Sequence, residues 1–307
     1  MKHCGTSVNL FPLHFSPLHF FTNSRPCARA DLGYDAAMLS WKALFDRHPD
    51  VPAEKLRWWL SDFLDVSLTM LPWGTVPSPA ERTAFEAATA RLQGGEPVQY
   101  VCGKAPFWDF EVYVTPEVLI PRPETEQLVQ LALEVAVSAG KKVLDVGTGS
   151  GCIAIALKRA CPKCVVSGVD VSEAALAVAR ENALRLGVEV GFHSGDLLGA
   201  EADRSLDVLV ANLPYIGETE REDLPREVRD FEPALALFSG ADGTDLVVRL
   251  LDEARRVLKN QGKIVLETGE SQGHVYALAA ERFGWRLENR SDLAGRPRFW
   301  ILERPHV

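Results

Sequence analysis

The feature that most constrains the fold is a regular alternation of short apolar segments and amphipathic segments from residue 142 onward. Short apolar runs predict strands buried on both faces, and apolar residues at three-and-four spacing predict helices. This alternation is typical of a doubly wound sheet covered by helices. The predicted strands are residues 142–146, 164–169, 188–193, 208–212, 263–267, 285–289 and 298–302, and the predicted helices are residues 153–158, 173–186, 244–258 and 273–283.

The segment 208–212 runs into a turn, Asn212-Leu213-Pro214-Tyr215, that carries candidate chemistry. Pro214 ends the ladder, so Asn212 lies at the carboxyl end of its strand, where open α/β sheets bind ligands. The Asn212 side-chain carbonyl and the Leu213 backbone carbonyl offer two acceptors beside the Tyr215 ring, which suits a planar NH2 group. Taken alone, the same residues also suit an ordinary turn in which Asn212 caps locally.

A glycine-rich turn, Asp-x-Gly-x-Gly-x-Gly at residues 145–151, follows the first predicted strand. The glycines alone do not exclude NAD, because Asp170 stands at nearly the distance expected of a ribose-binding acid. Asp145 favours S-adenosylmethionine, since a carboxylate suits the ammonium of that cofactor and is a poor neighbour for phosphate. The predicted cofactor site comprises Asp145, Gly147, Thr148, Gly149, Ser150, Gly151, Asp170, Asp196, Leu197 and Asn212.

Two positions in this set have specific predicted roles. Asp170 is expected to accept hydrogen bonds from both ribose hydroxyls, and Asp196 and Leu197 are expected to meet the adenine. For Asp196, capping of its own loop is an equally good interpretation. Cys161 and Cys164 have metal-ligand spacing, but without a second pair or a nearby histidine no metal site is predicted.

Seven strands that close with a hairpin match the α/β, Rossmann-like fold of class I S-adenosylmethionine-dependent methyltransferases. Helical spacing before this unit predicts a small all-helical domain, and β-forming residues between turns predict a hairpin. The first residues contain no acid before Asp31 and predict a disordered extension, with a targeting peptide or an upstream start codon as alternatives. The predicted organisation is residues 1–37 extension, 38–104 helical substrate-recognition domain, 105–120 hairpin linker with β-formers at 95–100 and 107–114, and 121–307 methyltransferase domain.

Composition limits what this site can act on. A formal net charge of -9 argues against a protein that grips a phosphate backbone over a wide surface. No apolar run has the length of a membrane span. Six irregularly spaced cysteines make no disulfide framework, so reduced cysteines and a cytoplasmic location are expected.

The order of the Asp-x-Gly-x-Gly-x-Gly turn, Asp170 and Asn212-Leu213-Pro214-Tyr215 resembles that of amino-methyltransferases acting on glutamine, adenine or cytosine NH2 groups. Among these, the chain is similar to the PrmC/HemK family over about residues 40–305. The similarity lies in Gly95-Glu96-Pro97, Phe107-Trp108, Ile-Pro-Arg-Pro-Glu-Thr-Glu at 120–126, and Phe231-Glu232-Pro233. Leu213 stands where that family commonly has proline; since this position is expected to contribute its backbone carbonyl, activity is expected to survive.

The resemblance implies transfer of a methyl group from S-adenosylmethionine to the side-chain nitrogen of the glutamine in the Gly-Gly-Gln loop of peptide chain release factors. Asn212, Leu213, Pro214 and Tyr215 are then the expected catalytic residues. Carbonyl acceptors and a stacked ring would orient the amide, and no strong general base is required. The expected partner is a release factor, with no stable nucleic-acid binding, no membrane association and a monomeric state.

Two other classes remain open. One is an amino-methyltransferase of another target, either a ribosomal-protein glutamine or adenine or cytosine in nucleic acid, and the other is a non-catalytic binding module. The charge of the chain and the absence of a target-recognition insertion weigh against nucleic acid. The intact Asn212 turn weighs against a module without activity.

Overall fold

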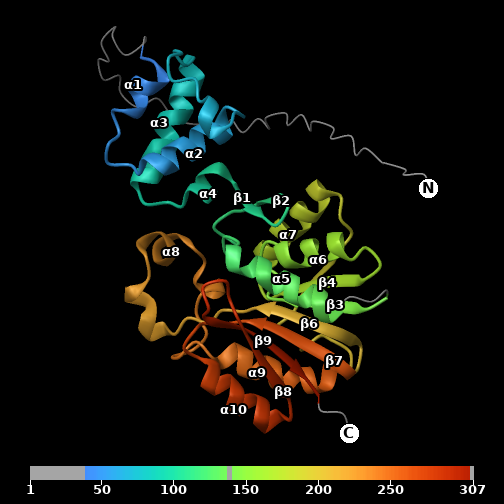
Figure 1. Ribbon diagram of the computed structural model, residues 1–307. Helices are drawn as coiled ribbons and strands as arrows, with labels where there is room; N and C mark the ends of the chain where they lie inside the picture. Colours follow the sequence, from blue (N-terminus) through green and yellow to red (C-terminus); the bar gives the residue numbers. More distant parts are fainter. Residues whose placement is uncertain (1–38, 137–139, 305–307) are drawn as a thin grey trace, which may run out of the picture.

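The computed structural model describes residues 39–136 and 140–304. Its centre is a seven-stranded sheet in the order β5-β4-β3-β6-β7-β9-β8 (Figure 1). The parallel ladders run from β5 to β7, and β9 is antiparallel to both of its neighbours. The predicted Rossmann-like class I methyltransferase fold with a closing hairpin is therefore confirmed. The strands are β3 (Lys142–Val146), β4 (Val165–Asp170), β5 (Gly191–Ser194), β6 (Leu206–Asn212), β7 (Leu258–Glu267), β8 (Arg286–Ser291) and β9 (Pro297–Glu303).

Helices cover both faces of this sheet because successive strand residues point to opposite sides. Val143, Val208 and Val210 pack in one core cluster with three helices, whereas Leu144 and Leu209 pack in the other with two. The first face is covered by α5 (Pro123–Ala136), α6 (Cys152–Ala160) and α7 (Glu173–Leu186), and the second by α9 (Asp245–Val257) and α10 (Gly273–Phe283). Burial on both faces explains why these strands read as continuous apolar runs.

The amino-terminal helices have an apolar core of their own. Trp41, Trp59 and Phe85 meet in edge-on ring contacts at its centre. Ser78 and Glu81 form a capping box at the third helix, which fixes where that helix begins. The helices are α1 (Trp41–Phe45), α2 (Ala53–Phe63), α3 (Pro79–Gln93) and α4 (Val98–Cys102), with a 3-10 turn η2 (Leu68–Met70).

The predicted β-structure at residues 95–100 is wrong, because part of this segment is helix α4. Pro97 stands at the N-cap, and Gly103 ends the helix at φ 73°, a conformation that glycine adopts without strain. The hairpin instead pairs β1 (Lys104–Phe107) with β2 (Phe110–Tyr113). Likewise β5 begins later than predicted, since the Val188 N–H is used to close α7 at the Ala183 carbonyl.

An arm of short helices between β6 and α9 was not predicted. It contains η3 (Glu218–Asp223), α8 (Arg226–Phe231) and η4 (Ala234–Ala236). Lys55 of α2 forms an ion pair with Glu227 of α8 at 2.5 Å, so the arm contacts the amino-terminal helices. In Figure 1 the arm lies between those helices and the part of the sheet formed by β7 and β9.

Two further findings bear on the sequence predictions. A disulfide joins Cys161 to Cys164, with 5.5 Å between their Cα atoms, whereas the sequence predicted reduced cysteines. Within residues 39–136 and 140–304, no helix combines the length and apolar character needed to cross a membrane. The predicted extension at residues 1–37 lies outside the described residues.

Close packing between β4 and the glycine turn gives a stability test. A Cβ atom at Gly168 would lie 2.7 Å from the Thr148 Oγ1 and 2.8 Å from the Phe192 ring. We expect Gly168→Ala to lower the free energy of unfolding by about 1 to 3 kcal/mol, as overpacking does. Urea unfolding followed by circular dichroism measures this.

Gly191→Ala in the neighbouring strand is the matched control. Its Cβ would meet nothing closer than the Ser167 Cβ at 4.0 Å. The free energy of unfolding should then stay the same or rise slightly, because alanine restricts the unfolded chain. Equal losses in both variants would contradict the packing argument.

Candidate functional site

A cavity of about 390 Å³ opens at the carboxyl ends of β3, β4 and β6. This volume is in the range of small-molecule sites. Its lining includes the glycine turn (146–150), the end of β4 (169–172), the loop after β5 (195–197), the turn after β6 (212–214), the segment leading into α5 (117–119, 121, 122 and 125) and the arm (233, 235 and 236). Six stretches of sequence thus meet at one site at the strand ends.

Most of the predicted site residues lie together in this cavity. Its walls contain Gly147, Thr148, Gly149, Ser150, Asp170, Asp196, Leu197, Asn212, Leu213 and Pro214. The predicted residues that do not line it are Asp145, Gly151 and Tyr215. Gly151 is instead the N-cap of α6, where a Cβ atom would come within 3.1 Å of Ala179 and Phe192.

The glycine turn follows a path that places backbone against the cavity. Gly147 and Gly149 adopt φ values of 71° and 53°, which side chains other than glycine rarely adopt. A Cβ atom at Gly149 would meet no atom within 4 Å among the described residues, so the turn presents bare backbone to open space. At Gly147, a Cβ atom would lie 2.9 Å from the Leu213 side chain, so the two predicted turns pack directly on each other.

Asp145 lies beneath this turn and is fully buried. Its Oδ2 accepts hydrogen bonds from the Thr148 hydroxyl at 2.6 Å and from the Ala154 N–H at 3.2 Å, which fixes the turn and the start of α6. Its Oδ1 has no hydrogen-bond partner among the residues in the structure. Burial raises the pKa of Asp145 to about 7, although both hydrogen bonds oppose this shift.

Asp170 closes the opposite side of the turn. Its Oδ2 accepts the Gly149 N–H and its Oδ1 accepts the Ser172 N–H, each at 2.9 Å. A carboxylate oxygen accepts more than one hydrogen bond, so both oxygens retain capacity for a ligand. Asp170 is therefore held by backbone groups in a fixed orientation at the cavity wall.

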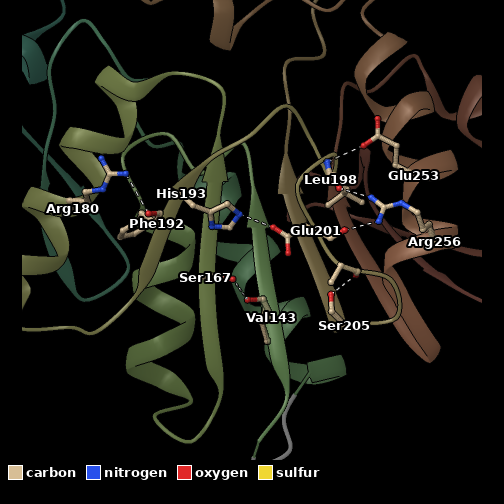
Figure 2. Close-up of polar contacts among 11 residues, drawn as sticks. Val143, Ser167, Arg180, Phe192, His193, Leu198, Glu201, Ser205, Glu253 and Arg256 are labelled. Carbon is tan, nitrogen blue, oxygen red and sulfur yellow. Dashed lines mark hydrogen bonds and ion pairs between the residues drawn. The ribbon is translucent and has the colours of Figure 1, made fainter.

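Polar side chains hold the loop that carries Asp196 and Leu197 (Figure 2). The His193 Nε2 lies 2.7 Å from the Glu201 Oε1, which assigns this histidine to loop structure. Arg256 of α9 donates to the carbonyls of Leu198 and Glu201 at 2.8 and 2.6 Å. Leu197 itself adopts φ 48°, so the loop is bent at the residue that faces the cavity.

Asn212 is held by Thr125, a residue of the motif at 120–126. The Asn212 Nδ2 donates to the Thr125 Oγ1 at 3.0 Å. The Thr125 hydroxyl also interacts with the Glu267 carboxyl and favours its ionised form. Asn212 and Glu267 stand opposite each other in the β6–β7 ladder. The motif at residues 120–126 was the only sequence signal for Thr125, and the sequence assigned no specific role to Glu267.

Tyr215 lies beyond the cavity, in a second hollow lined by Gly269 and Gln272 among others. The Gln272 Nε2 donates to the Tyr215 carbonyl at 2.5 Å, and the Tyr276 hydroxyl donates to the Gln272 Oε1 at 2.8 Å. Gly243 leaves room for this contact, since its Cβ would lie 2.1 Å from the Tyr215 carbonyl oxygen. The turn after β6 is thus anchored at both ends.

Two motifs that lie far apart in the sequence meet at the cavity. The Arg122 guanidinium pairs with the buried Glu232 carboxylate at 2.5 Å, and Glu232 also accepts the Ile120 N–H at 3.4 Å. This joins the segment before α5 to the arm, whose Pro233 and Leu235 line the cavity. Such a buried pair fixes the arm against the site.

Comparisons with known proteins agree with this geometry. Residues 137–289 match a family model described as a methyltransferase domain. The chain is 41% identical over 228 residues to the release factor glutamine methyltransferase of Koribacter versatilis, covering 73% of this chain and 81% of that protein. It is 37% identical over 239 residues to the one of Rhodopirellula baltica, covering 75% and 81%, and 38% identical over 225 residues to the one of Enterococcus faecalis, covering 73% and 81%.

The cofactor is S-adenosylmethionine, and the residues present suit it. Gly149 leaves open space at the turn, and Asp170 offers acceptors for ribose hydroxyls. The unpartnered Oδ1 of buried Asp145 suits a nearby positive charge. S-adenosylmethionine has no pyrophosphate, so it needs only a close approach to the backbone of the glycine turn, and the cavity allows this.

Asp170 provides a direct test of cofactor binding. Asp170→Ala removes both carboxylate oxygens from the cavity wall, and we expect S-adenosylmethionine affinity to fall by about 1 to 3 kcal/mol. Isothermal titration calorimetry measures the change. Asp207→Ala is the matched control. Asp207 also accepts a backbone N–H, from Lys142, but it lies at the amino end of its strand, away from the cavity. Equal loss of affinity in both variants would show a general effect on folding.

The raised pKa of Asp145 gives a second test. The cofactor brings positive charges, which favour the ionised carboxyl and lower its pKa. Because the pKa of Asp145 lies at about 7 without the cofactor, binding at pH 7 is expected to release protons from this group. Calorimetry in two buffers of different ionisation enthalpy measures the release. If Asp145→Asn releases as many protons as the unaltered enzyme, Asp145 does not sense the cofactor.

Proposed function

The chain belongs to the release factor glutamine methyltransferase family, and on that premise we propose that it methylates the glutamine of the Gly-Gly-Gln loop in peptide chain release factors. The methyl group of S-adenosylmethionine is transferred to the side-chain amide nitrogen. The observation that carries the proposal is the placement of Asn212 and Leu213 in the wall of the cofactor cavity, at the strand end.

The target nitrogen determines what these residues do. An amide lone pair is delocalised into its carbonyl, so the nitrogen is a weak nucleophile and needs accurate positioning. The Asn212 Oδ1 and the Leu213 carbonyl accept its two N–H groups and favour the positive charge that develops on nitrogen. The bound cofactor supplies an electrophilic methyl group on a sulfonium. We assign no general base, because the methylated nitrogen loses its proton readily afterwards.

Packing keeps the catalytic turn rigid although Leu213 replaces the usual proline. Leu213 is 4% exposed and belongs to the core cluster that also contains Val146 and Leu209. Its Cδ2 lies 2.9 Å from where a Cβ atom of Gly147 would be, so the two turns pack tightly on each other. Pro214 fixes the backbone that follows. Tertiary contacts thus supply the stiffness that a second proline supplies elsewhere.

We assign to Tyr215 the role of stacking on the amide plane of the substrate glutamine. The Tyr215 carbonyl is held by Gln272, and Tyr215 lines a hollow with Gly269 and Gln272 beside the turn. Burial raises the pKa of its hydroxyl, which keeps the phenol neutral. A neutral ring offers its π face to the nitrogen as charge develops there.

The amino-terminal helices and the arm are assigned to recognition of the protein substrate. The proposed domains remain residues 38–104 for recognition, 105–120 for the linker and 121–307 for the methyltransferase unit. The ion pair of Lys55 with Glu227 joins the recognition helices to the arm beside the cavity. We propose further that the enzyme acts as a monomer in the cytoplasm without stable nucleic-acid binding, which the net charge of -9 supports.

Asn212→Ala tests the catalytic role. It removes an acceptor used in the transition state and leaves the glycine turn and Asp170 in place. The kcat is expected to fall about 10²- to 10³-fold with little change in cofactor affinity. Asn260→Ala, at the exposed opposite end of β7, should leave both unchanged. If cofactor affinity falls as much as kcat, Asn212 serves the cofactor instead.

The substrate is tested by mass spectrometry. A release factor incubated with the enzyme and S-adenosylmethionine should gain one methyl group on the glutamine of its Gly-Gly-Gln loop. Replacement of that glutamine by alanine should abolish the transfer. Ribosomes and DNA are offered in parallel, and methylation of either with none of the release factor would identify a different substrate class.

A further inference from the structure

We propose that Thr125 and Glu267 are positioning residues that set the amide orientation of Asn212, so that its carbonyl oxygen and not its NH2 group faces the substrate. The Asn212 Nδ2 donates to the Thr125 Oγ1 at 3.0 Å, and Glu267, the ladder partner of Asn212, interacts with the Thr125 hydroxyl. This proposal rests on the proposed function, because it concerns how the same site selects an amide nitrogen.

Three elements bring these side chains together. Asn212 ends β6 and Glu267 ends β7, and the two residues are partners in the parallel ladder. Thr125 is in the first turn of α5, and it is 3% exposed and lines the cavity. Glu267 is 1% exposed and does not line the cavity, so it acts through Thr125 and not on the substrate.

The orientation follows from counting protons. An ionised carboxylate only accepts hydrogen bonds, so the single proton of the Thr125 hydroxyl is given to Glu267. The Thr125 oxygen is then left as an acceptor, and only the NH2 end of Asn212 can donate to it. The opposite orientation would set two oxygens against each other. The Asn212 Oδ1 is therefore the end left for a ligand, and a ligand must donate to it.

Burial makes this arrangement sensitive to pH. Burial raises the pKa of Glu267 to about 7, while the hydrogen bond from Thr125 and the charges of Arg298 and Arg122 favour the ionised form. A protonated Glu267 donates to Thr125, whose own proton is then free to turn toward Asn212 and reverse its orientation. The titratable and charged groups that interact electrostatically with Glu267 are Arg122, Glu124, Cys152, Tyr215 and Arg298.

The first experiment compares Thr125→Val with Thr125→Ser. Valine keeps the shape of the side chain without the hydroxyl, and serine restores the hydroxyl. We expect kcat on the release factor to fall about tenfold in Thr125→Val with unchanged cofactor Kd, and to recover in Thr125→Ser. In an Asn212→Ala background, Thr125→Val should cost nothing further, because its effect passes through Asn212. A full additional loss in that background would overturn the proposal.

The second experiment measures selectivity, which general damage to the fold would not change in this way. A release factor with Gln→Glu in its Gly-Gly-Gln loop presents only acceptors, so it opposes the Asn212 Oδ1 but suits a reversed amide. The unaltered enzyme should bind the glutamine form more tightly. This preference is expected to shrink about tenfold in Thr125→Val and to persist in Thr125→Ser. A parallel loss of affinity for both forms would contradict an orienting role.

A third measurement needs no substrate and separates this proposal from the proposed function. In the 15N-labelled enzyme without cofactor, the Asn212 side-chain NH2 should exchange slowly with solvent. Exchange should accelerate in Thr125→Val and not in Thr125→Ser, and the signal should titrate near pH 7 unless Glu267→Gln removes the carboxyl. If the enzyme fails to methylate any release factor, the proposed function fails, yet these spectra still decide the orientation. Equal exchange in the unaltered enzyme and in Thr125→Val would overturn it.

Discussion

The parallel register of β3, β4, β6 and β7 is the constraint on which the site depends. Parallel strands bring their carboxyl ends to one edge, so Asp170, Asn212 and Glu267 lie along it although they are far apart in sequence. The apolar runs before them are buried on both faces, which fixes how far each strand extends. The apolar core thus determines the positions of the polar side chains at the strand ends.

Two buried carboxylates near the carboxyl ends of the strands each interact with a threonine hydroxyl. Asp145 accepts a hydrogen bond from the Thr148 hydroxyl and holds the glycine turn, and Glu267 interacts with Thr125, which accepts a hydrogen bond from Asn212. In each, one oxygen has no hydrogen-bond partner among the described residues, and burial raises the pKa to about 7. Such carboxyls are costly to ionise without a nearby cation. Glu267 has the charges of Arg122 and Arg298 near it, and a cationic cofactor would offset the cost at Asp145.

Contacts between distant segments complete the enclosure of the site. Arg122 and Glu232 join the start of α5 to the arm, and Lys55 joins the amino-terminal helices to the arm. The exposed face of the arm contributes Leu235, which is 60% exposed and also lines the cavity. A partly exposed apolar residue at the mouth of a cavity gains burial when a ligand covers it.

The sequence by itself determined the order along the chain of the apolar strands, the glycine turn, Asp170 and the Asn212 turn. It could do so because periodicity and backbone chemistry are local properties. It failed at residues 95–100, where β-forming side chains lie in helix α4, and at the arm, whose short helices carry little periodicity. It placed Asn212 at the carboxyl end of its strand and included Thr125 only within the motif at residues 120–126. Only the tertiary structure decided that Thr125 holds Asn212 and that Leu213 packs against Gly147, because such contacts join residues whose separation in sequence carries no pattern.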